Sequence, residues 1–153
     1  MKPEQIRLEL IKIVDGANDW QGVRHLMLKL KREDSEIVLE GLLEIFFLDD
    51  LYRYQAAVGG LLWKLKPKYK RNLREDIKRS LKNWDVSIEE LPWYFAEVAG
   101  IEEVRKEVES LLTESLEKEA KQRAKTYLYW LSLETPEEFK ASLDRGWNSR
   151  LRG

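Results

Sequence analysis

The chain has 153 residues, of which 43% are hydrophobic, so it can build one continuous core and is short for two domains. Its 27 Lys and Arg residues nearly balance 28 Asp and Glu residues, and the formal net charge of -1 predicts neither a nucleic acid nor a membrane as partner. Cysteine is absent, which excludes disulfides, thiolate metal sites and a cysteine nucleophile, and is typical of a reducing compartment.

The amino-terminal residues pass directly into an amphipathic helical pattern, without the apolar stretch of a secretory signal. No apolar run approaches the roughly 20 residues that are needed to cross a bilayer. We therefore expect a cytoplasmic protein that does not bind membranes.

Apolar residues recur every three to four positions along the chain, without the alternating β-branched runs of strands, so the sequence predicts an all-α fold. Pro3 suits the first position of a helix, and Ser35 is a candidate N-cap for the third helix. We expect about eight or nine short antiparallel helices. They span residues 3–15, 18–30, 35–48, 50–65, 69–82, 87–99, 101–112, 115–132 and 135–146. Because Pro92 would lie in the opening turn of the sixth helix, this helix can instead begin at Leu91.

The last predicted helix ends at Gly146, because glycine commonly follows the final turn of a helix. The chain is thus divided into a single helical-repeat domain, residues 1–146, and a basic carboxyl-terminal tail, residues 147–153. Two interpretations of the tail remain open. Trp147 packs as a cap before a frayed end, or the tail binds a partner through its arginines.

Between Arg53 and Lys64 the fourth predicted helix carries no charge, and it contains Gly59 and Gly60. Each glycine in a helix interior costs about 1 kcal/mol relative to alanine, so close approach of another helix is the expected compensation. The preceding helix is apolar except for one stripe of glutamates, which predicts burial on most sides. Both helices should therefore lie at the centre of the fold.

Successive pairs of these helices begin near residues 3, 36, 69 and 101, an interval of about 33 that is typical of helical repeats. Residues 50–61 place an Asp in the turn, Arg53 at the head of the second helix, and small residues after it. This segment resembles the HEAT repeat of the HEAT and armadillo class, and weaker echoes extend over residues 3–132. The resemblance implies a right-handed HEAT-like stack of helices and a tendency to bind partners.

The candidate binding site is a basic stretch over residues 64–82, which contains only two acidic residues. Its helical part gathers basic side chains within about a third of the circumference, where an acidic protein surface or a phosphate backbone can dock. The alternative is a solvated face that balances the acidic segment 85–119. The predicted binding residues are Lys70, Arg71, Arg74, Lys78 and Lys82, with the aromatic residues Tyr69 and Trp93.

Trp93 is included because three consecutive aromatic residues, 93–95, cannot all face one side of a helix, so one points outward or into a neighbouring element.

Arg53 is predicted to pair with Asp49, Asp50 or Asp19 and so brace adjacent repeats, or else to face a ligand. His25, the single histidine, is expected to be exposed or half-buried, without a catalytic role. Glutamates 36, 40 and 44 are expected to form a solvated ridge.

No hydrolase, P-loop or dinucleotide-binding motif occurs in the sequence, so we expect no catalytic activity, cofactor or metal. The leading hypothesis is a non-enzymatic interaction module that binds another protein, such as a bacterial adaptor or an immunity-type protein. The alternative is a nucleic-acid-binding HEAT-like protein that uses the basic stretch, with or without processing of a base. The oligomeric state is left open.

Overall fold

The computed structural model describes residues 1–16, 19–132 and 136–152. The regular secondary structure of these ranges consists of nine helices, which confirms the predicted all-α fold. None of these helices combines the length and the apolar character that a membrane span requires. The helices are α1 (Pro3–Val14), α2 (Asp19–Leu30), α3 (Ser35–Leu48), α4 (Tyr52–Leu65), α5 (Leu73–Ser80), α6 (Glu90–Ala99), α7 (Ile101–Leu112), α8 (Lys118–Leu131) and α9 (Pro136–Arg152).

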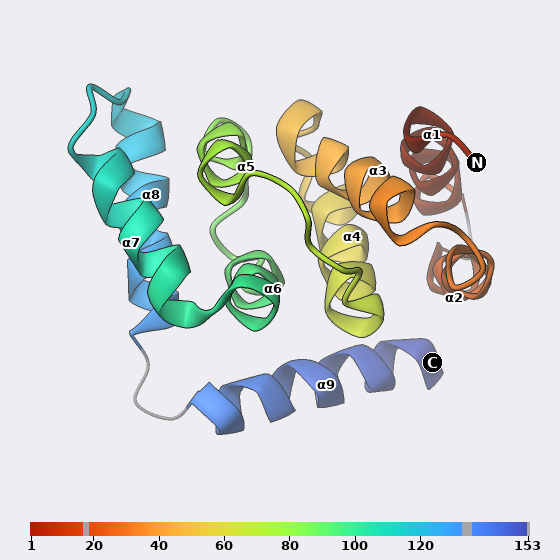
Figure 1. Cartoon of the computed structure of the whole chain (residues 1–153). Coiled ribbons are helices and arrows are strands. Elements are labelled where there is room, and N and C mark those ends of the chain that lie inside the picture. Colours follow the sequence, from red (N-terminus) through yellow and green to blue (C-terminus); the bar gives the residue numbers. More distant parts are fainter. Residues whose placement is uncertain (17–18, 133–135, 153) are drawn as a thin grey trace.

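The first eight helices form two layers (Figure 1). Helices α1, α3, α5 and α7 contact one another in that order and make up what we call the A layer. Helices α2, α4, α6 and α8 contact one another in the same way and make up the B layer. Helix α9 lies across the B layer at the bottom of the view and contacts α2 and α4, so a helix from the end of the chain covers this side.

Helices α3 and α4 lie at the centre of the core, as the sequence predicts. Every residue of α4 from Tyr54 to Trp63 is buried. The two glycines of this helix allow close contacts, because a Cβ atom at Gly59 would lie 2.9 Å from Ile88 Cγ2. At Gly60 a Cβ atom would lie 2.0 Å from a ring atom of Trp147. The close approach of other segments therefore accounts for both glycines.

One helix start and one N-cap differ from the prediction. Helix α5 begins at Leu73 instead of residue 69, since the side chain of Asn72 accepts a hydrogen bond from the Glu75 amide at 3.0 Å. At the start of α3 the N-cap is Asp34 and not Ser35. The Ser35 hydroxyl instead accepts a hydrogen bond from the Lys68 amide, which ties the loop before α5 to α3.

Other boundaries move by a few residues. The Ser87 amide donates to the Asp85 carboxylate at 2.9 Å, and this turn delays the start of α6 to Glu90. Gly100, with a φ of 96°, ends α6 as predicted, because few other residues adopt that backbone conformation. Helix α5 ends at Ser80, and α8 begins at Lys118 instead of residue 115.

The prediction that the last helix ends at Gly146 is wrong, since α9 continues through this glycine to Arg152. The predicted boundary between domain and tail, at residues 146 and 147, thus falls inside a helix. Trp147 is buried with 3% exposure, which agrees with the packed-tryptophan interpretation but not with a frayed end directly after it. The predicted start at Thr135 lies outside the described residues.

Candidate functional site

Two of the predicted binding residues hold a buried carboxylate. Arg71 donates to both oxygens of Asp76, with N to O distances of 2.8 and 2.9 Å, and the Tyr69 hydroxyl donates to the same carboxylate at 2.7 Å. Asp76 is only 2% exposed. The hydrogen bond to Asp76 raises the pKa of Arg71, while burial raises the pKa of Tyr69. These hydrogen bonds therefore tie the segment before α5 to the first turn of this helix.

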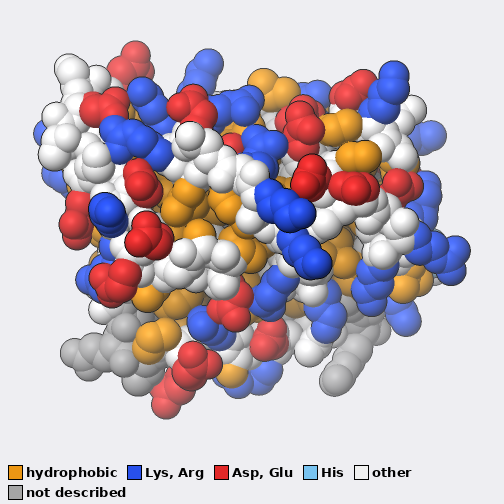
Figure 2. Space-filling model, in the orientation of Figure 1, with side chains coloured by type: hydrophobic (Ala, Val, Ile, Leu, Met, Phe, Trp, Pro, Cys, Tyr) orange, Lys and Arg blue, Asp and Glu red, His pale blue; other side chains and the backbone are white. Residues whose placement is uncertain are grey.

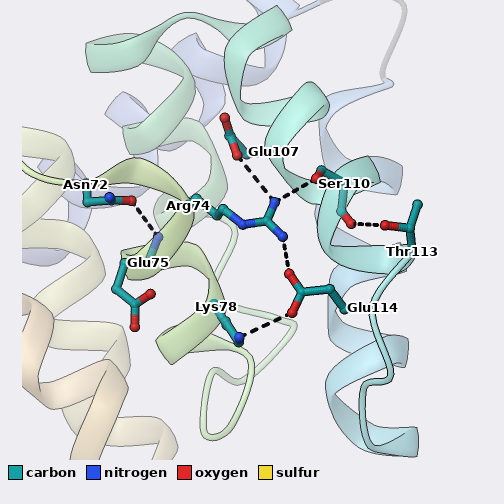
Figure 3. A network of polar contacts seen from close by, with 8 residues as sticks. All are labelled: Asn72, Arg74, Glu75, Lys78, Glu107, Ser110, Thr113 and Glu114. Atoms are coloured by element: carbon teal, nitrogen blue, oxygen red, sulfur yellow. Dashed lines mark hydrogen bonds and ion pairs between the residues drawn. The ribbon is translucent and has the colours of Figure 1, made fainter.

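Arg74 and Lys78 form a network of ion pairs with α7 and the residues that follow it (Figure 3). The Arg74 guanidinium donates to Ser110 Oγ at 2.7 Å and pairs with the carboxylates of Glu107 and Glu114. Lys78 Nζ lies 3.2 Å from Glu114 Oε1, and this contact lowers the pKa of Glu114. Both cations thus hold α5 against α7.

Lys70 and Lys82 complete the predicted basic site, and they are more exposed. Lys70 Nζ lies 3.9 Å from Glu36 Oε1, and both side chains are about two-thirds exposed, at 69% and 66%. Among the described residues no carboxylate pairs with Lys82, which borders a surface pocket of about 630 Å³ together with Leu116 and Arg123. The structure therefore does not bring the predicted basic residues together as one open surface.

Acidic and basic side chains alternate over much of the face shown in Figure 2, with basic side chains gathered at the lower right, over α2. His25 of α2 is exposed, as predicted. Glu36 and Glu40 are exposed on α3, and Glu44, the third residue of this stripe, is partly buried, which raises its pKa. Within the described residues no three His, Cys, Asp or Glu side chains are grouped in a way that could hold a metal ion.

The surface aromatic predicted at residues 93–95 is not at the surface. Trp93 is 1% exposed, and the two residues after it are fully buried. The Trp93 ring stacks on Phe139 of α9, with centroids 5.3 Å apart. The second predicted alternative, that one ring points into a neighbouring element, is therefore confirmed, and the neighbour is α9.

Helix α9 packs on a set of aromatic and small residues that we call the α9-binding face. One side of α9 carries Phe139, Leu143 and Trp147 at four-residue spacing, which places them in one row. The Trp147 ring lies over Gly60, in the space that a Cβ atom there would need, and makes an edge-to-face contact with Trp20, with ring centroids 5.7 Å apart. The face consists of Trp20 from α2, Gly60 and Trp63 from α4, and Trp93 from α6.

Polar contacts fix the position of α9 along this face. The Trp63 Nε1 atom donates to Asp144 Oδ1 at 2.7 Å, and Lys140 Nζ pairs with Glu97 at 2.9 Å. Near the end of the helix the Arg150 guanidinium lies over the Trp20 ring, 5.4 Å from its centroid. Contacts at both ends and in the middle give the bound helix a defined register.

A pocket of about 260 Å³ remains between α9 and the B layer. Glu89 and Glu90 line it from the start of α6, and burial raises the pKa of both carboxyls. The indole N–H groups of Trp93 and Trp147 are buried and find no acceptor in the part of the chain that the structure describes. Two buried donors at this interface therefore lack a partner among the described residues, and a pocket that opens to the surface runs beside α9.

Arg53 pairs with Asp15, which is not one of the predicted partners, and the side chain of the predicted partner Asp19 lies outside the described part of the structure. The Arg53 guanidinium donates to Asp15 Oδ1 at 2.9 Å, and Tyr54 donates to the same carboxylate. These hydrogen bonds, that of Tyr54 first, lower the pKa of Asp15. The Arg53 side chain is 59% exposed, so it joins α1 to α4 from the surface and not from the edge of the core.

Sequence reasoning missed the α9-binding face. The spacing of Phe139, Leu143 and Trp147 is visible in the sequence, but Gly146 predicts the end of the helix and so separates Trp147 from the other two residues. It also missed Gln55, a fully buried amide that bonds two turns. The sequence signal for a buried polar side chain was the single amide, Gln55, in the uncharged segment between Arg53 and Lys64.

Comparison of the chain with protein-family models, with curated proteins and with solved structures gives no match.

Proposed function

We propose that this chain is a non-enzymatic interaction module, built as a HEAT-like stack, that binds another protein through the α9-binding face. The arrangement in two layers supports the HEAT-like part of this proposal, because each layer is formed by alternate helices in chain order. Helical-repeat proteins commonly bind partners on the surface of one such layer.

The observation that carries the proposal is that the B layer already binds a helix. Trp20 of α2 and Trp93 of α6 contact the row of side chains on α9, and Trp63 of α4 donates a hydrogen bond to Asp144 beside that row. Gly60 leaves room for a ring of the incoming helix. Aromatic anchors packed into recesses are the usual basis of affinity at protein interfaces, and helix docking on an apolar face is a recurring mode of recognition. An adaptor or an immunity-type protein would use such a face.

Charge favours a protein over a nucleic acid as the partner. Of the predicted basic residues, Arg71, Arg74 and Lys78 form ion pairs within the chain. An anionic partner would have to displace these carboxylates before it could use those cations. The α9-binding face is mainly aromatic and apolar, so a partner there would compete with α9 and not with carboxylates of the chain.

A site-specific photo-crosslinking experiment tests this function. A photoreactive phenylalanine derivative replaces Tyr52, which is 52% exposed and lines the pocket beside α9. We expect a discrete protein adduct in native cells, and none from the same group at Glu103, an exposed position on α7 in the A layer. Equal labelling of the two positions, or adducts with nucleic acid alone, would contradict the proposal.

Binding of nucleic acid is the alternative, and basic residues in the last turn of α4 and in the loop after it favour it. Within the described residues no carboxylate pairs with Lys64 or Lys68, and Lys70 has only the long contact to Glu36. Phosphate contacts make affinity fall steeply with salt. Fluorescence anisotropy with single-stranded and duplex oligonucleotides should show salt-dependent binding that Lys64→Ala and Lys68→Ala weaken if this alternative holds. Absence of binding at low salt excludes it.

A further inference from the structure

Helix α9 is an incomplete match for the surface that it covers. The pocket of about 260 Å³ lies along α9 and is lined by Leu143, Trp147 and Arg150 on one side and by Ala56 and Ile88 on the other. The pocket opens to the surface, since Tyr52, Ser142 and Arg150 in its lining are exposed, so α9 leaves this part of the B layer incompletely covered. A longer side chain at position 143 or 146 of a different helix would fill it.

The polar groups of the same interface are also incompletely matched. The Nε1 atoms of Trp93 and Trp147 are buried without an acceptor among the described residues, and a buried unpaired donor is unfavourable. Trp93 belongs to the B layer, and its ring contacts Phe139 of α9, so this donor lies close to the interface. A helix that presents an acceptor to Trp93 would gain a hydrogen bond that α9 does not make.

Helix α9 itself is weakened by Gly146. A Cβ atom at this position would meet no atom within 4 Å, so no close contact requires the glycine. Glycine within a helix lowers helix stability relative to alanine. The pocket, the unpaired donors and this glycine together indicate that α9 binds the face less tightly than a better-matched helix would.

We propose that α9 is a displaceable occupant of the α9-binding face, and that the external ligand of this face is an amphipathic helix of another protein. The inference rests on the proposed function, because it names the partner class of the same surface. The partner helix carries two aromatic residues eight positions apart with an aliphatic residue midway, as Phe139, Leu143 and Trp147 do.

Polar residues of the face further define this partner. Glu97 selects a basic residue directly after the first aromatic position, where α9 has Lys140. The Trp63 indole selects an acceptor three positions before the second aromatic residue, where α9 has Asp144. Such pairs set register and orientation more than affinity. A helix with this pattern and an added acceptor for Trp93 would compete with α9.

The test uses the full chain and a fluorescent peptide with the sequence of residues 136–152 as the probe. In the wild-type chain the tethered α9 should exclude the peptide, because a short tether gives a high effective concentration. In the double variant Phe139→Ala/Trp147→Ala the chain's own α9 loses both rings. We expect this variant to bind the peptide at least about tenfold more tightly than the wild type does.

Two further variants examine the face and α9 separately. Adding Gly60→Ala to the double variant should abolish peptide binding, because the new methyl group occupies the space of the peptide's tryptophan ring. Gly146→Ala in the otherwise wild-type chain should tighten α9 and weaken peptide binding by about fivefold. A matched control, Glu138→Ala/Arg145→Ala, changes two exposed residues of α9 and should behave as the wild type.

Hydrogen exchange of each variant shows whether α9 is released while α4 stays protected. The inference is overturned if the double variant leaves α9 amides protected, or if α9 opens and the peptide still fails to bind. It is also overturned if light scattering shows that copies of the chain exchange α9 to form a dimer, since the occupant is then a second copy. If the crosslinking at position 52 captures a protein while the peptide fails to bind, the proposed function stands and only this inference fails.

Discussion

The side chain of Gln55 joins two turns of the fold from a fully buried position. Its Nε2 atom donates to the carbonyl oxygens of Asp49 at 2.9 Å and Asn83 at 2.7 Å, and its Oε1 atom accepts from the Asp85 amide at 2.7 Å. All hydrogen-bonding groups of the amide are therefore used. One side chain of α4 thus fixes the turn before α4 relative to the turn before α6.

Replacement of Gln55 by Leu should lower the free energy of unfolding by about 2 to 4 kcal/mol, because two carbonyls and one amide lose their partner in the interior. Urea denaturation at neutral pH measures the change. The control is Gln21→Leu at an exposed position of α2, where we expect a change within about 0.5 kcal/mol. Equal stability of the two variants would show that the bonds of Gln55 contribute little.

Glu90 makes stability depend on pH. Burial raises its pKa above the ordinary glutamate value of 4.5, against the attraction of Arg150. The folded chain thus holds this proton at pH values where the unfolded chain has already lost it. Stability therefore falls as the pH rises from 4.5 through the folded-state pKa.

The variant Glu90→Gln, which cannot ionise, should be more stable than the wild type at pH 7 and should lose this part of the pH dependence. Urea midpoints measured at a series of pH values for both chains provide the check. Glu103→Gln, at an exposed position of α7, serves as the matched control and should leave the profile unchanged. Parallel profiles for wild type and Glu90→Gln would contradict the assignment.

At the scale of helices, glycines have opposite roles in α3 and α9. A Cβ atom at Gly41 would lie 2.8 Å from Ile6 Cβ and 2.9 Å from the Pro3 carbonyl oxygen, so α1 approaches α3 as closely as the backbone allows. No neighbour approaches Gly146 in this way. Substitution by alanine therefore has a steric consequence in α3 and none in α9.

We expect Gly41→Ala to lower the free energy of unfolding by about 1 to 3 kcal/mol, because steric overlap outweighs the gain in helix propensity. Gly146→Ala should raise the stability of α9 by up to about 1 kcal/mol. Thermal and urea unfolding of the two variants measure these changes. A stabilised Gly41→Ala variant would show that α1 shifts without loss of packing.

At the scale of the whole molecule, stability should decrease from the centre of the two layers toward α9. Helices α3 and α4 are buried along most of their length, whereas α9 buries one row of side chains and leaves a pocket beneath it. Regions with few buried apolar contacts open locally, without global unfolding. The stack and α9 should thus behave as two units of different stability.

Native-state hydrogen exchange should show α4 amides exchanging only through global unfolding, and α9 amides through a local opening of lower free energy. The α9 amides should therefore exchange at rates that depend little on low concentrations of urea. Loss of protection in α4 and α9 together, with the same dependence on urea, would mean that α9 is an integral part of the cooperative core.

Periodicity and the distribution of charge along the sequence determined the all-α fold, most helix boundaries, and the central position of the helix with Gly59 and Gly60. These features are local, because three- and four-residue spacing and an uncharged segment define which side of a helix avoids water.

Tertiary structure alone decided which carboxylates pair with the basic residues. Arg74, for example, pairs with Glu114, 40 positions away along the chain. Only the packing of α9 on the B layer turned Trp93 into a buried contact and carried the helix through Gly146, since both depend on surfaces that distant segments build together.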